Sequence, residues 1–144
     1  GIGINYTSVR SYGSRIGGTN GRSSGLVPLM RVMNGIGDYI DQGGGKRSGT
    51  ISPYIADWNA DLLDVLSLRS VRKTTIAEEN HRLYYAVWVS NYLFDCVEKG
   101  EDWHFFSPSD VPDLADLHGE EFVVRYKFYV SEGKSKFSLP ALEV

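Results

Sequence analysis

The amino-acid sequence predicts an α/β domain, because segments typical of short strands alternate with segments of helical spacing along its 144 residues. That length suits one ordinary domain, and a content of 42% hydrophobic and 23% charged residues is typical of a globular protein. Thirteen of the sixteen glycines lie before Thr50, together with an excess of positive charge, whereas the rest of the chain is acidic. Glycine-rich backbone with positive charge suits a phosphate-bearing ligand, so we expect the first third to carry the function.

The first third predicts a strand, a loop and a helix. Hydrophobic side chains nearly alternate with smaller or polar ones over residues 2–9, which indicates a short strand. Residues 11–25 have no packing period and form a long polar loop, and loops of that length in a compact domain are usually functional or disordered. Helical spacing follows over residues 26–40, with Pro28 in the first turn. Its apolar surface is wider than one stripe, so this helix is buried on more than one side or packs against another subunit.

The middle of the chain predicts two further strands and a helix. Residues 41–49 form a second glycine-rich segment, and residues 50–55 read as a strand. Residues 57–68 alternate acidic and apolar positions as a short helix would, and we expect the aspartates of 57–64 to form its solvated face. Residues 83–89 are rich in aromatic and branched side chains and read as a buried strand.

The last third predicts two helices around a turn region. Residues 91–99 read as a helix that is closed by the following glycine. Residues 105–112 form a turn region, in which Ser109 or Asp110 is a plausible helix cap. Helical spacing returns over residues 119–132.

Composition excludes several classes of protein. A formal net charge of -3 and a pI near 5.6 argue against a surface made for DNA or for an anionic membrane. No apolar run approaches the roughly 18 residues that span a bilayer, and no basic and apolar leader stands at the N-terminus. We therefore expect a soluble, cytoplasmic polypeptide with no DNA or membrane partner.

Few side chains in the sequence carry recognisable catalytic chemistry. Cys96 lies among apolar helix positions and is expected to be a buried, inert thiol, and a single cysteine excludes an internal disulfide. The three histidines lack metal-ligand spacing, so no metal site is expected. Trp58, Trp88 and Trp103 are expected to lie in the core. No nucleophile and base pair is apparent, so no catalytic residue is assigned.

The two glycine-rich segments are the candidates for ligand binding. Residues 41–49 read D-Q-G-G-G-K-R-S-G, which combines an adaptable backbone with two cations and side chains able to read a nucleobase edge. They do not fit a Walker A loop, and a flexible surface connection is the alternative. Residues 11–25 offer arginines, hydroxyls and unencumbered amides that could fold over a triphosphate, or they form an ordinary solvated loop.

Six short motifs follow one another along the chain. They are G-I-G-I-N at 1–5, S-x-I-x-G-T-N-G at 14–21, G-L-V-P-L at 25–29, D-Q-G-G-G-K-R at 41–47, F-S-P-S-D-V-P at 106–112 and G-E-E-F at 119–122. In this order and spacing they resemble the large subunit of class I ribonucleotide reductase. The resemblance covers nearly the whole chain and weakens after about Lys134.

This resemblance implies a fold and an activity. Residues 1–144 would be part of the family's ten-stranded α/β barrel, which reduces ribonucleotides to deoxyribonucleotides with a transient thiyl radical. A dNTP or ATP effector, bound near the dimer interface, would select the base that is reduced. The resemblance places a first specificity loop at about 11–25, a dimer-interface helix at about 27–40 and a second specificity loop at about 41–49.

The resemblance also implies roles for single residues. The implied effector-binding residues are Arg10, Ile16, Ser24, Tyr39 and Asp41. Among these, Arg10 would contact the effector phosphates, and Tyr39 would reach the effector of the neighbouring subunit. The implied substrate-binding residues are Gly1, Gln42, Lys46 and Arg47. Gln42 and Arg47 would communicate with the substrate, Lys46 would support the loop, and Gly1 would allow close approach.

Several of the family's catalytic parts are absent from these residues. The N-x-C-x-E motif, the redox cysteine pair, the C-terminal tyrosines and the ATP cone are missing, and Cys96 matches none of the functional cysteines. The chain alone is therefore predicted to be inactive and to bind no cofactor or metal itself. We expect it to act with the remaining large-subunit polypeptide, a second large subunit and a radical-generating small subunit. The alternative is a non-catalytic, nucleotide-binding regulatory remnant of the fold.

Overall fold

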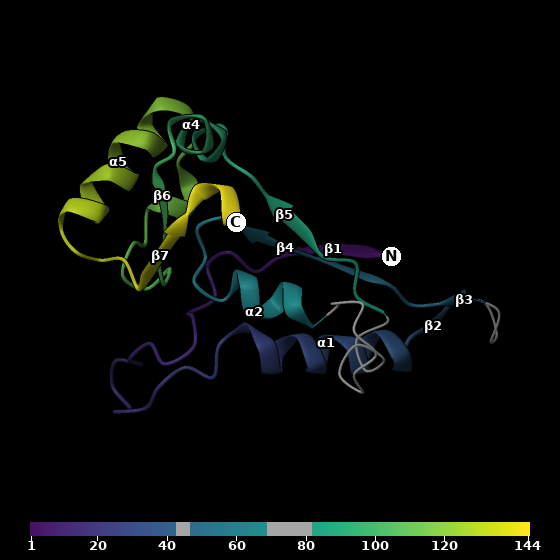
Figure 1. Ribbon diagram of the computed structural model, residues 1–144. Helices are drawn as coiled ribbons and strands as arrows, with labels where there is room; N and C mark the ends of the chain where they lie inside the picture. The colour runs from purple at the N-terminus through teal and green to yellow at the C-terminus, as the bar shows by residue number, and fades with distance from the viewer. Residues whose placement is uncertain (43–46, 69–81) are drawn as a thin grey trace.

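The chain has an α/β fold, as the sequence predicts (Figure 1). The computed structural model describes residues 1–42, 47–68 and 82–144. Within these ranges the parallel sheet has three strands and does not close into a barrel.

The parallel sheet has the strand order β1-β4-β5. Its strands are β1 (Ile2–Asn5), β4 (Ile51–Ala56) and β5 (Ala86–Trp88). Ile2 pairs with Ile51 at one end of β1 and β4, and Tyr54 pairs with Ala86 across β4 and β5. Parallel neighbours require a crossover connection, and between β1 and β4 that connection contains a long loop and a helix.

Two helices lie on one side of this sheet (Figure 1). They are α1 (Leu26–Tyr39) and α2 (Leu62–Ser67). The inward side of α1 carries Leu26, Met30, Asn34 and Gly37, whose spacing places them on one face of the helix. Leu26 and Met30 share one hydrophobic core with Ile55 of β4 and Val65 of α2. The core between sheet and helices therefore holds α1 in place from its first turn.

The rest of the chain packs beyond the carboxyl ends of the parallel strands (Figure 1). It contains α4 (Asn91–Lys99), β6 (Asp102–Phe105), the 3-10 helix η1 (Leu114–Asp116), α5 (Gly119–Ser131), β7 (Phe137–Pro140) and the 3-10 helix η2 (Ala141–Glu143). Strands β6 and β7 pair antiparallel, and the rings of Trp103 and Tyr126 stack with centroids 4.6 Å apart. The backbone N–H of Phe106 donates to the carbonyl oxygen of Trp58 at 2.8 Å, which joins this part to the end of β4.

Most of the predicted elements are confirmed. The strand within 2–9, the helix over 26–40, the strand at 50–55 and the helix over 119–132 all form within a few residues of the predicted bounds. The helix predicted over 91–99 is α4, and Gly100 ends it in the left-handed conformation with a φ of 67°. The glycine-rich segment 41–49 contains two short paired strands, β2 (Asp41–Gln42) and β3 (Arg47–Ser48), and the residues between them lie outside the described part of the chain.

The strand prediction for residues 83–89 was wrong about burial. Only Ala86–Trp88 form a strand, and Trp88 is 70% exposed, so the prediction that it lies in the core was also wrong. Trp58 and Trp103 are buried as predicted. Trp88, the aromatic residue of β5, instead lines a cavity at the carboxyl ends of the parallel strands.

Two predictions for the polar turns were also wrong. The helix expected over 57–68 begins only at Leu62, and Asp57 and Asp61 are buried rather than solvated, because they accept hydrogen bonds from backbone N–H groups. Neither Ser109 nor Asp110 caps a helix, because η1 begins after Asp113. The pairing of β6 with β7 was not predicted.

Candidate functional site

Residues 11–25 form a narrow loop whose two arms are bonded to each other. The N–H of Gly13 donates to the carbonyl oxygen of Ser23 at 2.9 Å, and the N–H of Ser23 donates to that of Ser14 at 2.8 Å. Farther along the loop, the N–H of Ile16 donates to the carbonyl oxygen of Gly21 at 2.9 Å. The loop therefore returns to its starting point, and it leads directly into the first turn of α1.

Three exposed arginines, Arg10, Arg15 and Arg22, surround this loop. The Nη1 atom of Arg10 donates to the carbonyl oxygen of Arg15 at 2.7 Å, and Nη1 of Arg22 donates to that of Gly13 at 3.3 Å. The hydroxyl of Ser23 donates to the carbonyl oxygen of Arg10 at 2.9 Å. A guanidinium carries five N–H donors, so Arg10 can hold the loop with one donor and bind an anion with others.

The structure brings together three of the five residues implied to bind an effector. Arg10 is bonded to both arms of the loop, Ile16 lies half-buried near the loop tip, and Ser24 is exposed where the loop meets α1. Ser24 also lines a hollow of about 410 Å³, together with Arg31 and Asp64. The loop that carries Ile16 and Ser24 leads into the N-terminal end of α1 (Figure 1).

The base of the loop is held by one buried carboxylate, that of Asp61. The N–H of Tyr12 lies 2.9 Å from its Oδ1 and 3.1 Å from its Oδ2, and the N–H of Leu26 donates to Oδ2 at 2.8 Å. Leu26 is the first residue of α1, and the preceding Gly25 has no side chain that could cap the helix. Asp61 therefore caps α1 from another part of the chain, where its negative charge also favours the helix dipole.

Gly25 must be a glycine for this arrangement to form. Its φ is 72°, and an added Cβ would lie 2.5 Å from Oδ2 of Asp61 and 2.8 Å from the backbone nitrogen of Tyr12. A side chain there would push the carboxylate and the loop apart.

A second buried group, the hydroxyl of Ser107, holds the first arm of the loop. Ser107 accepts from the N–H of Ser11 at 3.3 Å and from the hydroxyl of Ser14 at 2.7 Å. Asn59, which is fully buried, accepts from the hydroxyl of Ser11 at 3.4 Å and from the N–H of Asp61 at 2.9 Å. The loop is thus anchored by residues 59–61 and by Ser107, which lie far from it in the sequence.

Most of the other residues implied by the resemblance belong to the opposite end of α1, to β2 or β3, or to the start of the chain, which Figure 1 labels there. Tyr39 is the last residue of α1 and is 89% exposed, and β2 with Asp41 and Gln42 follows directly. Gly1 precedes β1, and the N–H of the next residue donates to the carbonyl oxygen of Thr50 at 3.2 Å. Arg47 lies in β3, whereas Lys46 lies outside the described residues.

These two groups of residues are well separated within one chain. A helix of 14 residues is about 21 Å long at 1.5 Å per residue. Arg10, beside the loop that precedes it, and Tyr39, at its end, are therefore separated by about the length of this helix within a single copy.

Part of the exposed surface of α1 and of the residue that follows it is apolar. Val32 is 59% exposed, Ile36 39% and Ile40 43%, and their spacing of four residues places them on one stripe with Tyr39. An added Cβ at Gly35, beside this stripe, would meet open space. We call Val32, Ile36, Tyr39 and Ile40 the α1 stripe.

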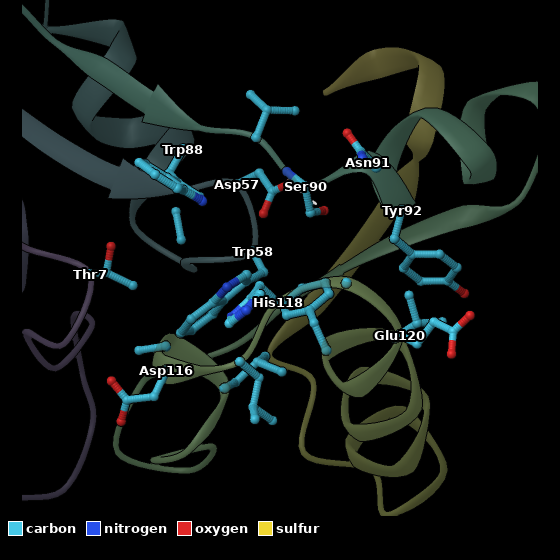
Figure 2. A pocket seen from close by; sticks show the side chains of 18 of the residues that line it. Thr7, Asp57, Trp58, Trp88, Ser90, Asn91, Tyr92, Asp116, His118 and Glu120 are labelled. Carbon is cyan, nitrogen blue, oxygen red and sulfur yellow. Dashed lines mark hydrogen bonds between the residues drawn. The ribbon is translucent and has the colours of Figure 1, made fainter.

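A cavity of about 890 Å³ lies at the carboxyl ends of the parallel strands (Figure 2). Trp58, Trp88 and Tyr92 supply aromatic surface to it, and His118 also lines it. Its carboxyl groups come from Asp57, Asp95, Asp116 and Glu120. Carboxylates repel phosphate, so the charge of this cavity does not suit the phosphates of a nucleotide, whereas the arginines at the base of α1 do.

Asp57 is the most perturbed acid of this cavity. The N–H and the hydroxyl of Ser90 donate to its Oδ2 at 2.7 and 2.8 Å, and Figure 2 shows the two side chains next to each other. Desolvation by burial raises the pKa of Asp57 to about 6, although the hydrogen bonds from Ser90 oppose the change.

The remaining groups show no catalytic arrangement within the described residues. Cys96 is buried as predicted, and burial raises the pKa of its thiol, which disfavours the reactive thiolate. In the described ranges, no three acidic, histidine or cysteine side chains are grouped so that they could hold a metal ion. None of the helices described is long and apolar enough to cross a bilayer.

Sequence reasoning missed the anchoring residues Asn59, Asp61 and Ser107. Ser107 lies in a motif used for the resemblance, but nothing in that motif indicated a contact with residues 11–14. Asp61 was taken for a solvated helix position because acidic and apolar residues alternate around it. The glycine at 25, directly before a helix that it cannot cap, was the one local signal that a cap must come from elsewhere.

The structure and its site define an α/β domain with a basic loop at the start of a crossover helix. Comparison with known proteins is more specific, because residues 1–144 match the family model described as the ribonucleotide reductase barrel domain. The chain is 44% identical over 147 residues to the ribonucleoside-diphosphate reductase large chain of Schizosaccharomyces pombe, covering 100% of this chain and 18% of that protein. The chain is 42% identical over 139 residues to the large subunit of Arabidopsis thaliana, and the match covers 94% of this chain and 16% of that protein. It is 41% identical over 142 residues to the large subunit of Caenorhabditis elegans, and the match covers 98% of this chain and 18% of that protein.

The chain belongs to the ribonucleotide reductase family, and it corresponds to part of the barrel domain of the family's large subunits. It spans 16% to 18% of the length of these three relatives.

Proposed function

We propose that this chain supplies the effector-binding and substrate-selecting segment of a ribonucleoside-diphosphate reductase large subunit. The match of the whole chain to large subunits, at 44% identity to the first of these relatives, carries the proposal. A dNTP or ATP effector binds at the loop of residues 11–25, with its phosphates at Arg10. The segment 41–49 then passes the identity of the effector to the substrate base.

The separation of the two groups of residues along α1 supports an effector site shared between two copies. Because Arg10 and Tyr39 lie at opposite ends of a helix about 21 Å long, one effector can contact both only if they come from different chains. An antiparallel pair of α1 helices, packed through the α1 stripe, brings the beginning of one helix next to the end of the other. Such a pair has the two-fold symmetry usual for homodimers.

Charge also favours the arginine-rich end as the effector site. Arg10, Arg15 and Arg22 are exposed there, whereas the larger cavity is lined by four acidic side chains. Ile16 and Ser24 lie beside the arginines and can contact the base or the sugar.

The chemistry of reduction belongs to other parts of the enzyme. We propose that the remaining large-subunit polypeptide supplies the catalytic cysteines, that a separate small subunit supplies the radical, and that the assembly works in the cytoplasm. The segment itself acts by population shift, because an effector favours those conformations of residues 41–49 that accept one base.

Replacement of Arg47 tests this function in the complete reductase that contains the sequence. We expect Arg47→Ala to lower turnover and to blur selection among the four substrates more than it weakens effector binding. Competition assays with all four ribonucleotides, together with direct binding of dTTP, measure the two effects. Lys134→Ala, which removes an exposed cation just after the end of α5, is the matched control and should change neither. Unchanged selectivity in Arg47→Ala would contradict the assignment of residues 41–49.

A further inference from the structure

We infer that Asp61 is a positioning residue of the effector site, which locks the loop of residues 11–25 and the start of α1 into one rigid unit. The inference rests on the proposed function, because it concerns the same loop. Asp61 itself lies outside all six motifs that carry the resemblance, and its role follows from the structure alone.

The first argument is the sharing of one carboxylate by both ends of the loop. Tyr12 follows the first residue of the loop, and Leu26 follows its last residue. Both N–H groups donate to Asp61, and the distances of each to Oδ2 are 3.1 and 2.8 Å. A change in the position of either end therefore changes the hydrogen bonding of the other.

The second argument is burial. Asp61 is only 4% exposed, and its own N–H donates to Oδ1 of Asn59, which is fully buried. Asp61, Tyr12 and Leu26 also line the hollow of about 410 Å³, and there the carboxylate and the two N–H groups satisfy one another. The tight fit at Gly25, where a Cβ would lie 2.5 Å from Oδ2, leaves no room for another side chain.

The third argument is the position of Arg10 relative to this anchor. Its carbonyl oxygen accepts from Ser23 near the end of the loop, and its guanidinium donates to Arg15 near the tip. Two residues farther along the chain, Tyr12 is fixed by Asp61. The hydrogen bonds that place Arg10 therefore require the two ends of the loop to stay together, and Asp61 holds these ends through the N–H groups of Tyr12 and Leu26.

The test compares three variants of the complete reductase by direct binding of dTTP. Asp61→Asn keeps the shape of the side chain but replaces one acceptor oxygen by an NH₂ group, which cannot accept a hydrogen bond. The remaining neutral oxygen must then serve both N–H groups of the loop base or leave one of them unpaired. We expect the Kd for dTTP to rise about tenfold, which is in the range for a buried donor left unpaired.

Two controls separate positioning from stability. Glu98→Gln removes an exposed carboxylate from α4, on the part of the chain away from the loop, and should leave dTTP binding unchanged. Val65→Ala removes buried methyl groups from α2, the helix that follows Asp61, and should lower the melting temperature without changing the Kd. The inference is overturned if Asp61→Asn binds dTTP as tightly as the wild type does. It is also overturned if Val65→Ala, with the same loss of melting temperature as Asp61→Asn, raises the Kd for dTTP as much as Asp61→Asn does.

A measurement on the wild type keeps the test independent of how the variant folds. Hydrogen exchange should show the amides of Tyr12 and Leu26 protected to a similar degree, and dTTP should increase the protection of both together. Independent exchange of the two amides would contradict a shared anchor. If the wild type binds no dNTP at all, the proposed function fails instead, and that outcome is distinct.

Discussion

At the scale of single residues, Asp57 has the largest consequence for pH dependence. Its pKa is about 6 in the folded protein and 3.8 in an unperturbed chain. Between pH 3.8 and about 6, Asp57 holds its proton in the folded protein but loses it in the unfolded chain. The contribution of Asp57 to the free energy of unfolding is therefore fully present below pH 3.8 and is lost as the pH rises through about 6.

Replacement of Asp57 by asparagine should remove this dependence. The amide side chain would stay neutral and can still accept from Ser90, so we expect Asp57→Asn to be more stable than the wild type at pH 7 and similar to it at pH 4. A shift of that size corresponds to about 3 kcal/mol at most. Thermal unfolding of the polypeptide that contains these residues, followed from pH 4 to 7, measures the effect. Asp64→Asn is the control, and an equal change in both variants would contradict the role of Asp57.

Single residues also show where the sequence was a poor guide. Cys96 was correctly predicted as buried, because its neighbours in the helix are apolar on the same face. Asp57, Asn59 and Asp61 were not, because their burial depends on donors that lie up to 49 residues away, from Ser90, Ser11, Tyr12 and Leu26. Polar residues satisfied by distant backbone groups leave no local pattern.

At the scale of elements, the α1 stripe is the feature with a direct test. Val32 lies in the middle of α1 and is 59% exposed although it is apolar, whereas Leu26 and Met30 of the same helix are fully buried. Exposed apolar stripes of this kind are typical of interfaces.

A charge on this stripe should therefore weaken the association of two large subunits. We expect Val32→Glu to raise the dimer dissociation constant at least about tenfold, since it places a carboxylate in an apolar contact. Sedimentation velocity of the complete large subunit, with and without dTTP, measures the change. Val124→Glu alters a similarly exposed valine on α5 and should leave association unchanged. Dimers of normal stability in Val32→Glu would show that α1 is not the contact.

Elements with a strong periodic pattern were predictable, and those defined by pairing at a distance were not. The helices α1, α4 and α5 follow from their spacing and from the glycine at 100. The pairing of β6 with β7 joins residues 32 to 38 positions apart, and four-residue strands carry too little pattern to reveal it. The exposure of Trp88 was not predicted, because the composition of residues 83–89 favours a strand but does not show whether other elements pack over both faces of that strand.

At the scale of the whole molecule, the order of motifs predicted the family and the α/β fold, and both are confirmed. The contacts of Arg10 with both arms of the loop before α1, and the position of the N-terminus and β2 near the far end of α1, became visible only in three dimensions (Figure 1). The roles of these residues remain predictions. The helix between the two groups is the feature that decides how many chains one effector must contact.

The length of α1 has a consequence for dimers assembled from two different variant chains. If each effector site is made of Arg10 from one chain and Tyr39 from the other, a chain with Arg10→Ala and a chain with Tyr39→Ala are each defective when paired with themselves. In a mixed dimer both lesions fall in the same site, and the second site is wholly wild type. Mixing the two inactive preparations should therefore restore effector response, to about a quarter of the wild-type sites when subunits reassort at random. Two lesions in one continuous site could not complement each other in this way.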